Sequence, residues 1–191
     1  MLLQYFLLGV APIIPALDGA PECDGGAMES TDINEILKYI NERRSTVVQG
    51  NQRNGQRKDN LPAGKYMNQI YWNCDLEKET MEFSTDVCDY PEQTPQKSQA
   101  YHADYDYDGE KVPSASSLVE TWLGMVDNNA LTEYGNGAVK YSEELNMADF
   151  VNLINPKTTD IGCAFGNCVI EDGGSKYTFY CLTNQSYVRV A

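Results

Sequence analysis

Six cysteines constrain the fold of this chain more than any other feature of its sequence. Their number is even, and all of them follow a long apolar N-terminal stretch. In an oxidising compartment they form up to three disulfides, but the sequence alone does not choose among the many pairings. The chain contains no Cys-x-x-Cys spacing and a single histidine, which argues against a structural zinc site. We therefore expect a disulfide-stabilised protein built on Cys23, Cys74, Cys88, Cys163, Cys168 and Cys181.

The N-terminal stretch is apolar and carries no charge from Met1 to Leu17. It is short for a membrane span and is interrupted by Pro12 and Pro15, so a secretory signal peptide over residues 1–19 fits it best. The alternative is a buried apolar N-terminal segment. With export predicted, we expect residues 20–191 to form one extracellular domain and to make no membrane insertion.

Composition then limits the partners. The formal net charge is −14 over 191 residues, and such a chain repels nucleic acid and anionic membrane surfaces. The apolar content is 42% and there are 13 tyrosines, which favours a folded chain over a disordered one. One glycosylation sequon begins at Asn184, a pattern consistent with a secreted protein.

Apolar side chains recur at three- and four-residue steps after Thr31, as on one face of a helix. Asp32 followed by Glu35 resembles a capping box at the start of this helix, and Gly50 is a natural stop. The stripe consists of Ile33, Ile36, Leu37, Ile40 and Val47.

Three more helices are expected further along the chain. One spans about 64–88, one spans 114–126 with Leu118, Trp122 and Met125 facing inward, and a short one spans 142–153. The polar, acidic and proline-punctuated residues 89–113 between them predict a long loop.

Past Pro156 the pattern changes to two β-rich runs on either side of "EDGG", which predicts a hairpin. Tyr177, Phe179 and Cys181 alternate with less apolar neighbours, as in a half-buried strand. Helices followed by strands, without a repeating strand–helix alternation, indicate an α+β domain whose helices pack on a small antiparallel sheet.

Three segments, in this order, resemble the CAP superfamily of cysteine-rich secretory, antigen-five and pathogenesis-related-one proteins. They are "LKYINERRSTV", "MNQIYWNCDLEKETMEFSTDVC" and "DFVNLINPKTTDIGCAFGNC". The details "WNC" and "GCAFGNC" are most similar to the Ancylostoma-secreted proteins of parasitic nematodes. The resemblance covers roughly residues 23–181, and it implies an α-β-α sandwich.

The family's central cleft carries two histidines and two glutamates, often with a divalent metal, and this chain departs from that pattern. Ile40 and Asp149 occupy the histidine positions, and Met125 occupies one glutamate position. The Gly-Glu-Asn turn expected near Ser98–Asp104 is missing, and Asn155 replaces a tryptophan. Because isoleucine offers no ligand atom and imidazole is the preferred ligand of zinc and copper, we expect neither a metal nor another cofactor in this cleft.

The stretch "HADYDYDGE" begins like a calcium loop. Asp104, Asp106, Asp108 and Gly109 fit the start of an EF-hand, but the last ligand position falls on Ala115, which cannot ligate. A low-affinity calcium site at these aspartates, with Glu110 folding back, stays open.

The same stretch suits protein recognition. Carboxylates steer an encounter with a basic surface, and tyrosines supply contact area, so the predicted partner-binding residues are Asp104, Tyr105, Asp106, Tyr107 and Asp108. The two tyrosines also fit sulfation sites. The bland alternative is a solvated loop.

Nothing in the sequence marks a catalytic site. The one histidine, His102, has no serine or free cysteine beside it that is marked as a nucleophile, and acidic pairs are expected by chance in so acidic a chain. We therefore expect a secreted, non-enzymatic protein that binds a host or cell-surface protein. The family resemblance implies modulation of an immune or haemostatic response. The alternative is an extracellular carrier of a lipid, a sterol or another small molecule.

Overall fold

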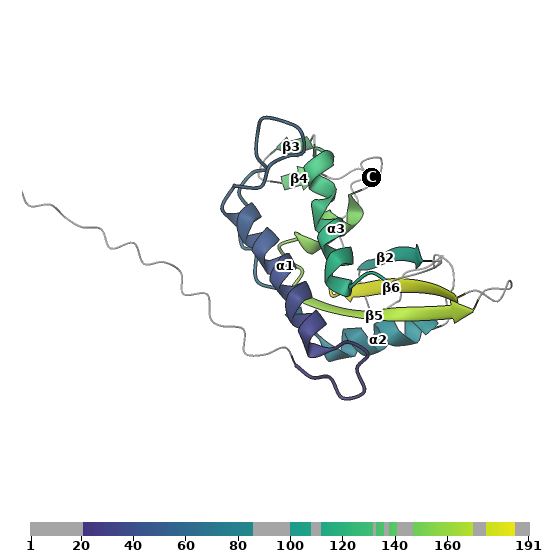
Figure 1. Ribbon diagram of the computed structural model, residues 1–191. Coiled ribbons are helices and arrows are strands. Elements are labelled where there is room, and N and C mark those ends of the chain that lie inside the picture. Colours follow the sequence, from purple (N-terminus) through teal and green to yellow (C-terminus); the bar gives the residue numbers. More distant parts are fainter. Residues whose placement is uncertain are drawn as a thin grey trace, which may run out of the picture.

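The computed structural model describes residues 21–85, 100–107, 112–131, 133–135, 138–140, 147–169 and 175–185. Within these ranges a four-stranded sheet lies between helices, as Figure 1 shows. The predicted signal peptide and Cys88 lie outside the described residues.

The sheet has the strand order β1-β5-β6-β2. β5 (Asp160–Val169) and β6 (Ser175–Thr183) form the predicted hairpin and pair in register from Ile161 opposite Thr183 to Val169 opposite Ser175. β1 (Tyr71–Trp72) pairs with β5 in the parallel direction. The sheet is therefore mixed, and the expectation of a purely antiparallel sheet was wrong for this one short strand.

Helices cover both faces of the sheet, which confirms the α-β-α sandwich (Figure 1). α2 (Cys74–Thr85) packs on one face, against β5 and β6. It lies so close that a Cβ at Gly162 would overlap the main chain of Glu77. α1 (Ser30–Val48) and α3 (Ala115–Asn128) pack against each other and cover the opposite face.

α1 confirms the predicted apolar stripe, because every one of its five members is buried. The capping box was wrong. The helix begins at Ser30 after an extended N-cap at Glu29 that makes no side-chain cap. Asp32 therefore lies in the first turn, where its negative charge interacts favourably with the positive end of the helix dipole. Gly50 follows the helix with a φ of 70°, as a glycine stop should.

The predicted helix over 64–88 was wrong in its first half. α2 begins only at Cys74, because the Asn73 side chain accepts hydrogen bonds from the backbone N–H groups of Asp75 (3.0 Å) and Leu76 (3.1 Å). The preceding residues run beside α1 and then enter β1. The apolar side chains before Asn73 therefore belong to a segment that packs against α1, and not to a helix of their own.

The predicted loop over 89–113 was also wrong in part, since β2 (Ala100–Tyr107) lies within it. β2 pairs with β6 from Ala100 opposite Thr183 to Tyr107 opposite Tyr177, with an irregularity after Asp104. Acidic residues are rare in strands, so the sequence of residues 100–107 gives little sign of a strand. Only the pairing with β6 identifies β2.

The helix after Ser114 is confirmed, with the Ser114 hydroxyl accepting a hydrogen bond from the Ser117 N–H as its cap. Of the predicted fourth helix, residues 142–146 lie outside the described residues, and α4 spans Ala148–Leu153 after a non-helical Met147. A two-stranded pair, β3 (Glu133–Gly135) and β4 (Ala138–Lys140), was not predicted.

Two hydrophobic clusters hold these layers together. The larger lies between α1, α3 and the sheet and contains Ile40, Trp122 and Phe179. The Trp122 and Phe179 rings stack there at 5.5 Å between centroids. The smaller joins α4 to the end of α1 through Val47, Phe150 and Met147. Among the residues described, no helix has the length and apolar character needed to cross a membrane.

Arg44 is a buried cation that connects α1 to several main-chain segments. It occupies the same stripe of α1 as Ile40 and Val47 and is only 2% exposed. Its side chain donates to the carbonyl oxygens of Asn68 (2.7 and 2.9 Å), Leu153 (2.6 Å), Asn155 (3.0 Å) and Thr158 (3.1 Å). Burial lowers the pKa of Arg44 to about 10, so the guanidinium keeps its proton at neutral pH.

Replacing Arg44 with alanine should lower the free energy of unfolding by about 3–4 kcal/mol, because each buried acceptor left without a donor costs about 1–3 kcal/mol. Urea unfolding of the oxidised protein measures this effect. The neighbouring Arg43, which is partly exposed and contacts Gln52 and Asp127, is the matched control, and its alanine variant should lose less than about 1 kcal/mol. Equal losses for the two variants would contradict the assigned role.

Candidate functional site

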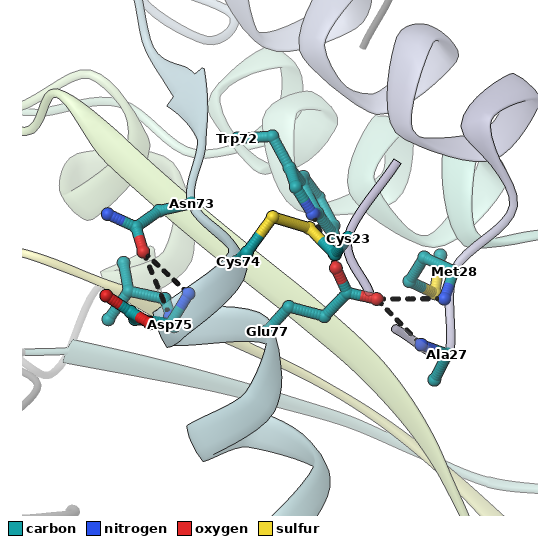
Figure 2. The surroundings of a disulfide bond; sticks show 9 residues. Cys23, Ala27, Met28, Trp72, Asn73, Cys74, Asp75 and Glu77 are labelled. Atoms are coloured by element: carbon teal, nitrogen blue, oxygen red, sulfur yellow. Dashed lines mark hydrogen bonds between the residues drawn. A yellow bond between two sulfur atoms is a disulfide. The ribbon is translucent and has the colours of Figure 1, made fainter. Parts of the chain in front are cut away.

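A disulfide corner joins the segment before α1 to the start of α2 (Figure 2). Cys23 and Cys74 are bonded across 51 residues of sequence. A second disulfide, Cys163–Cys181, crosses directly opposed residues of β5 and β6. The structure thus selects two pairings that the sequence left open, whereas the side chain of Cys168 lies outside the described residues.

Glu77 is buried at this corner and is 1% exposed. One of its carboxylate oxygens accepts from the backbone N–H groups of Ala27 (2.8 Å) and Met28 (2.9 Å), and the other accepts from the Trp72 indole N–H (2.7 Å), as Figure 2 lets the reader follow. Three donors thus compensate one buried carboxylate. Its role is to hold the N-terminal segment against α2.

The cleft position predicted to have lost its first histidine is Ile40. Its side chain is fully buried in the larger cluster, between α1, α3 and the sheet. It therefore contributes packing to the core and offers no donor atom to a cation.

The other substituted positions lie on the helices beside this cluster. Met125 on α3 is half-buried and packs against both hydrophobic clusters. Asp149 is half-buried in the first turn of α4, which packs against α3. Asn155 supplies one of the carbonyl oxygens that bind Arg44, so the residue in the tryptophan position helps to fix α1.

This set of side chains does not fit the divalent metal of the family cleft. Hydrocarbon and thioether replace imidazole and carboxylate at two positions, and Asp149 alone leaves most coordination sites to water. Over the described ranges, no three His, Cys, Asp or Glu side chains form a group that could hold a metal ion.

The acidic–tyrosine stretch belongs to the strand that ends the sheet order of the described residues. Asp104, Tyr105, Asp106 and Tyr107 lie in β2, which pairs with β6 and ends the described strand order. Asp108 and the side chains of β2 lie outside what the structure describes. Their roles as partner-binding or calcium-binding residues therefore stay predictions, but the stretch is placed on a scaffold strand.

His102 also lies in β2, opposite Cys181 of β6. Since Cys181 is bonded to Cys163, this neighbour is not a nucleophile.

Asn184, the sequon asparagine, makes four hydrogen bonds through its amide. The oxygen accepts from the N–H groups of Thr159 (3.1 Å) and Asp160 (3.2 Å), and the nitrogen donates to the side chains of the same two residues (2.8 and 2.9 Å). Glycosylation at this nitrogen stays a prediction, and an attached glycan would compete with these bonds.

Arg44 and Asn41 are among the positions whose structural roles were not recognised from the sequence. Arg44 had a usable signal, because a lone charged residue on an otherwise apolar helix stripe must find buried partners. Asn41 had none, although its amide pairs with both main-chain groups of Ile70 (2.8 and 3.0 Å).

Comparison with known proteins agrees with this architecture. The model of the CAP family, described as the cysteine-rich secretory protein family, matches residues 37–183, and the chain therefore belongs to this family. A search of curated proteins found no significant match.

Solved structures with the same fold include nematode proteins. BmVAL-1 is 19% identical with a TM-score of 0.70, and the match covers 88% of this chain and 84% of that one. NaASP2, in a structure with Zn²⁺, is 18% identical with a TM-score of 0.68 over 90% and 87% of the two chains. Na-ASP-1 is 20% identical with a TM-score of 0.66 over 87% of this chain and 40% of that chain. At these identities the likeness shows the fold.

Replacing Glu77 with glutamine should lower the free energy of unfolding by about 2–3 kcal/mol, because one amide nitrogen would face an N–H donor in a buried site. Denaturant titration without reductant measures this loss. Glutamine at the exposed Glu120 of α3 is the control, with an expected change within about 0.5 kcal/mol. A Glu77 variant as stable as this control would show that the three hydrogen bonds are dispensable.

Proposed function

We propose that this chain is a secreted, non-enzymatic CAP protein that binds a protein on the surface of another cell. Because the chain resembles the secreted proteins of parasitic nematodes, we take the partner to be a host protein and the outcome to be a changed immune or haemostatic response. Membership of the cysteine-rich secretory family supports export, as do the two disulfides Cys23–Cys74 and Cys163–Cys181.

The observation that carries the proposal is the position of β2. An acidic strand that alternates with tyrosines ends the described sheet order, on the side opposite β1. Charged residues on an edge strand discourage unspecific pairing with other sheets. The same residues attract a basic partner, and a sheet holds them more rigidly than the predicted loop would.

The non-enzymatic part of the proposal is supported by the substituted cleft. Ile40 is packed inside the core, and neither it nor Met125 supplies a base or a hard ligand. Hydrocarbon at Ile40 does not favour the lipid-carrier alternative either, because this side chain is fully enclosed by its neighbours.

Isothermal titration of the metal-free protein with zinc should give no heat above the buffer blank at micromolar concentrations, since the cleft positions lack imidazole. A calcium titration run in parallel tests Asp104, Asp106 and Asp108, where binding in the millimolar range at most is expected. Saturable micromolar zinc binding that Asp149→Asn abolishes would contradict the substituted cleft.

Reversing the charge of Asp104, Asp106 and Asp108 to lysine should remove most binding of the labelled protein to leukocytes or platelets in flow cytometry, since the steering field would change sign. A matched variant reverses three exposed acidic residues elsewhere, Asp24, Glu35 and Glu120, and changes the net charge equally. Retained binding by the first variant, or equal loss in both, would show that β2 is not the contact surface.

A further inference from the structure

The disulfide corner holds a short segment that comes before α1. We call residues 21–28 the N-terminal strap. The strap is tied to α2 by the Cys23–Cys74 disulfide and by two of its N–H groups, which donate hydrogen bonds to Glu77 (Figure 2). Cys23 and Met28 are partly buried, whereas the rest of the strap is exposed. The disulfide is therefore the covalent tie of a segment that is mostly surrounded by water.

The Cys23–Cys74 and Cys163–Cys181 disulfides differ in their access to solvent. Cys74 is exposed and Cys23 is partly exposed, whereas Cys163 and Cys181 are both fully buried. Reduction begins when a thiolate attacks one of the two sulfur atoms, so the attacking group has to reach that sulfur. A dissolved thiol therefore reaches the exposed disulfide in the folded protein, but it reaches the buried disulfide only after the sheet opens.

The two disulfides also differ in what remains after the bond is broken. The buried disulfide joins directly opposed residues of β5 and β6, which pair along both strands, so the sheet keeps its two sulfur atoms adjacent. The exposed disulfide closes a loop over 51 residues of sequence, and one of its cysteines belongs to the strap. Its reduction returns to the strap the conformational freedom that loop closure had removed.

We propose that the Cys23–Cys74 disulfide is a redox switch for the N-terminal strap. An extracellular thiol of the cysteine or glutathione kind reduces it selectively and releases the strap. The sheet stays folded, and the Cys163–Cys181 disulfide stays intact. The oxidised protein is the closed form, and the reduced protein is the open form.

The reaction balances with two thiols as the reductant. The first thiolate forms a bond to one sulfur of the pair, the S–S bond breaks, and the other cysteine leaves as a thiolate that takes a proton from water. A second thiolate then attacks the mixed disulfide and frees the remaining cysteine. Two electrons thus pass to the protein, and the two reductant thiols end as one disulfide.

Release of the strap changes the surface of the corner. Cys23 and Met28 pack against the larger hydrophobic cluster, which includes Trp72. Trp72 is buried, and its indole N–H donates to the same Glu77 carboxylate that holds the strap. When the strap moves away, water reaches this end of the cluster. The open form therefore presents apolar side chains that the closed form covers, and such exposure alters what a protein contacts.

The switch does not rest on the proposed function. It lies at the start of α2, directly after β1, whereas β2 ends the other side of the described sheet order. Cell binding that depends on Asp104, Asp106 and Asp108 is therefore expected to be the same before and after reduction, and failure of either proposal is distinguishable from failure of the other.

The test treats the intact oxidised protein with reduced glutathione at neutral pH. Samples are trapped with iodoacetamide at increasing times, and peptide mass spectrometry gives the labelled fraction of each cysteine. Cys23 and Cys74 should be labelled together and at least about 100-fold faster than Cys163 and Cys181, because the buried pair reacts only from an opened state. Oxidised glutathione, which supplies no electrons, is the control and should leave all four cysteines unlabelled.

Hydrogen exchange then shows whether reduction opens the strap. Amide exchange at Ala27 and Met28 should rise at least about tenfold in the selectively reduced protein, while β5 and β6 keep their protection, and reoxidation should restore the first rate. The double variant Cys23→Ser with Cys74→Ser should exchange like the open form without any reductant and should not respond to glutathione. If this variant does not fold, the measurements on the unsubstituted protein still decide the outcome.

Three results would overturn the inference. The first is reduction of the two disulfides at equal rates. The second is selective reduction that leaves the exchange of Ala27 and Met28 unchanged, which would show that the disulfide does not hold the strap. The third is loss of protection across β5 and β6 as soon as Cys23–Cys74 is reduced, which would show that this bond only stabilises the fold.

Discussion

The fold depends on a buried cation whose hydrogen-bond donors must be paired with main-chain carbonyl groups. Arg44 lies on the core side of α1, and its donors bind carbonyl oxygens from the segment before β1 and from the turn that leads into β5. A guanidinium removed from water costs free energy unless its hydrogen bonds are replaced. These two irregular segments are therefore held at fixed positions relative to the helix, and β1 and β5 start from them.

Glu77, on the side of the sheet covered by α2, also fixes an irregular segment of the chain. Its carboxylate collects donors from the N-terminal segment and from Trp72, beside the Cys23–Cys74 disulfide. Two buried ionised groups of opposite sign thus fix the irregular parts of the chain, while hydrocarbon clusters fix the regular parts. Ile40, at the position where the family resemblance predicts a histidine, is buried in the larger of these clusters.

The sequence by itself determined the helical stripe of α1, the helix after Ser114, the β5–β6 hairpin and the family, since periodicity and turn residues act locally. Only the tertiary structure decided that Tyr71–Trp72 pair with β5 and that the acidic stretch is a strand, because strand pairing depends on partners far along the chain. It also brought the carbonyl groups of Asn68, Leu153 and Thr158 together around Arg44. Long-range packing sets such neighbours, and no single segment of sequence encodes them.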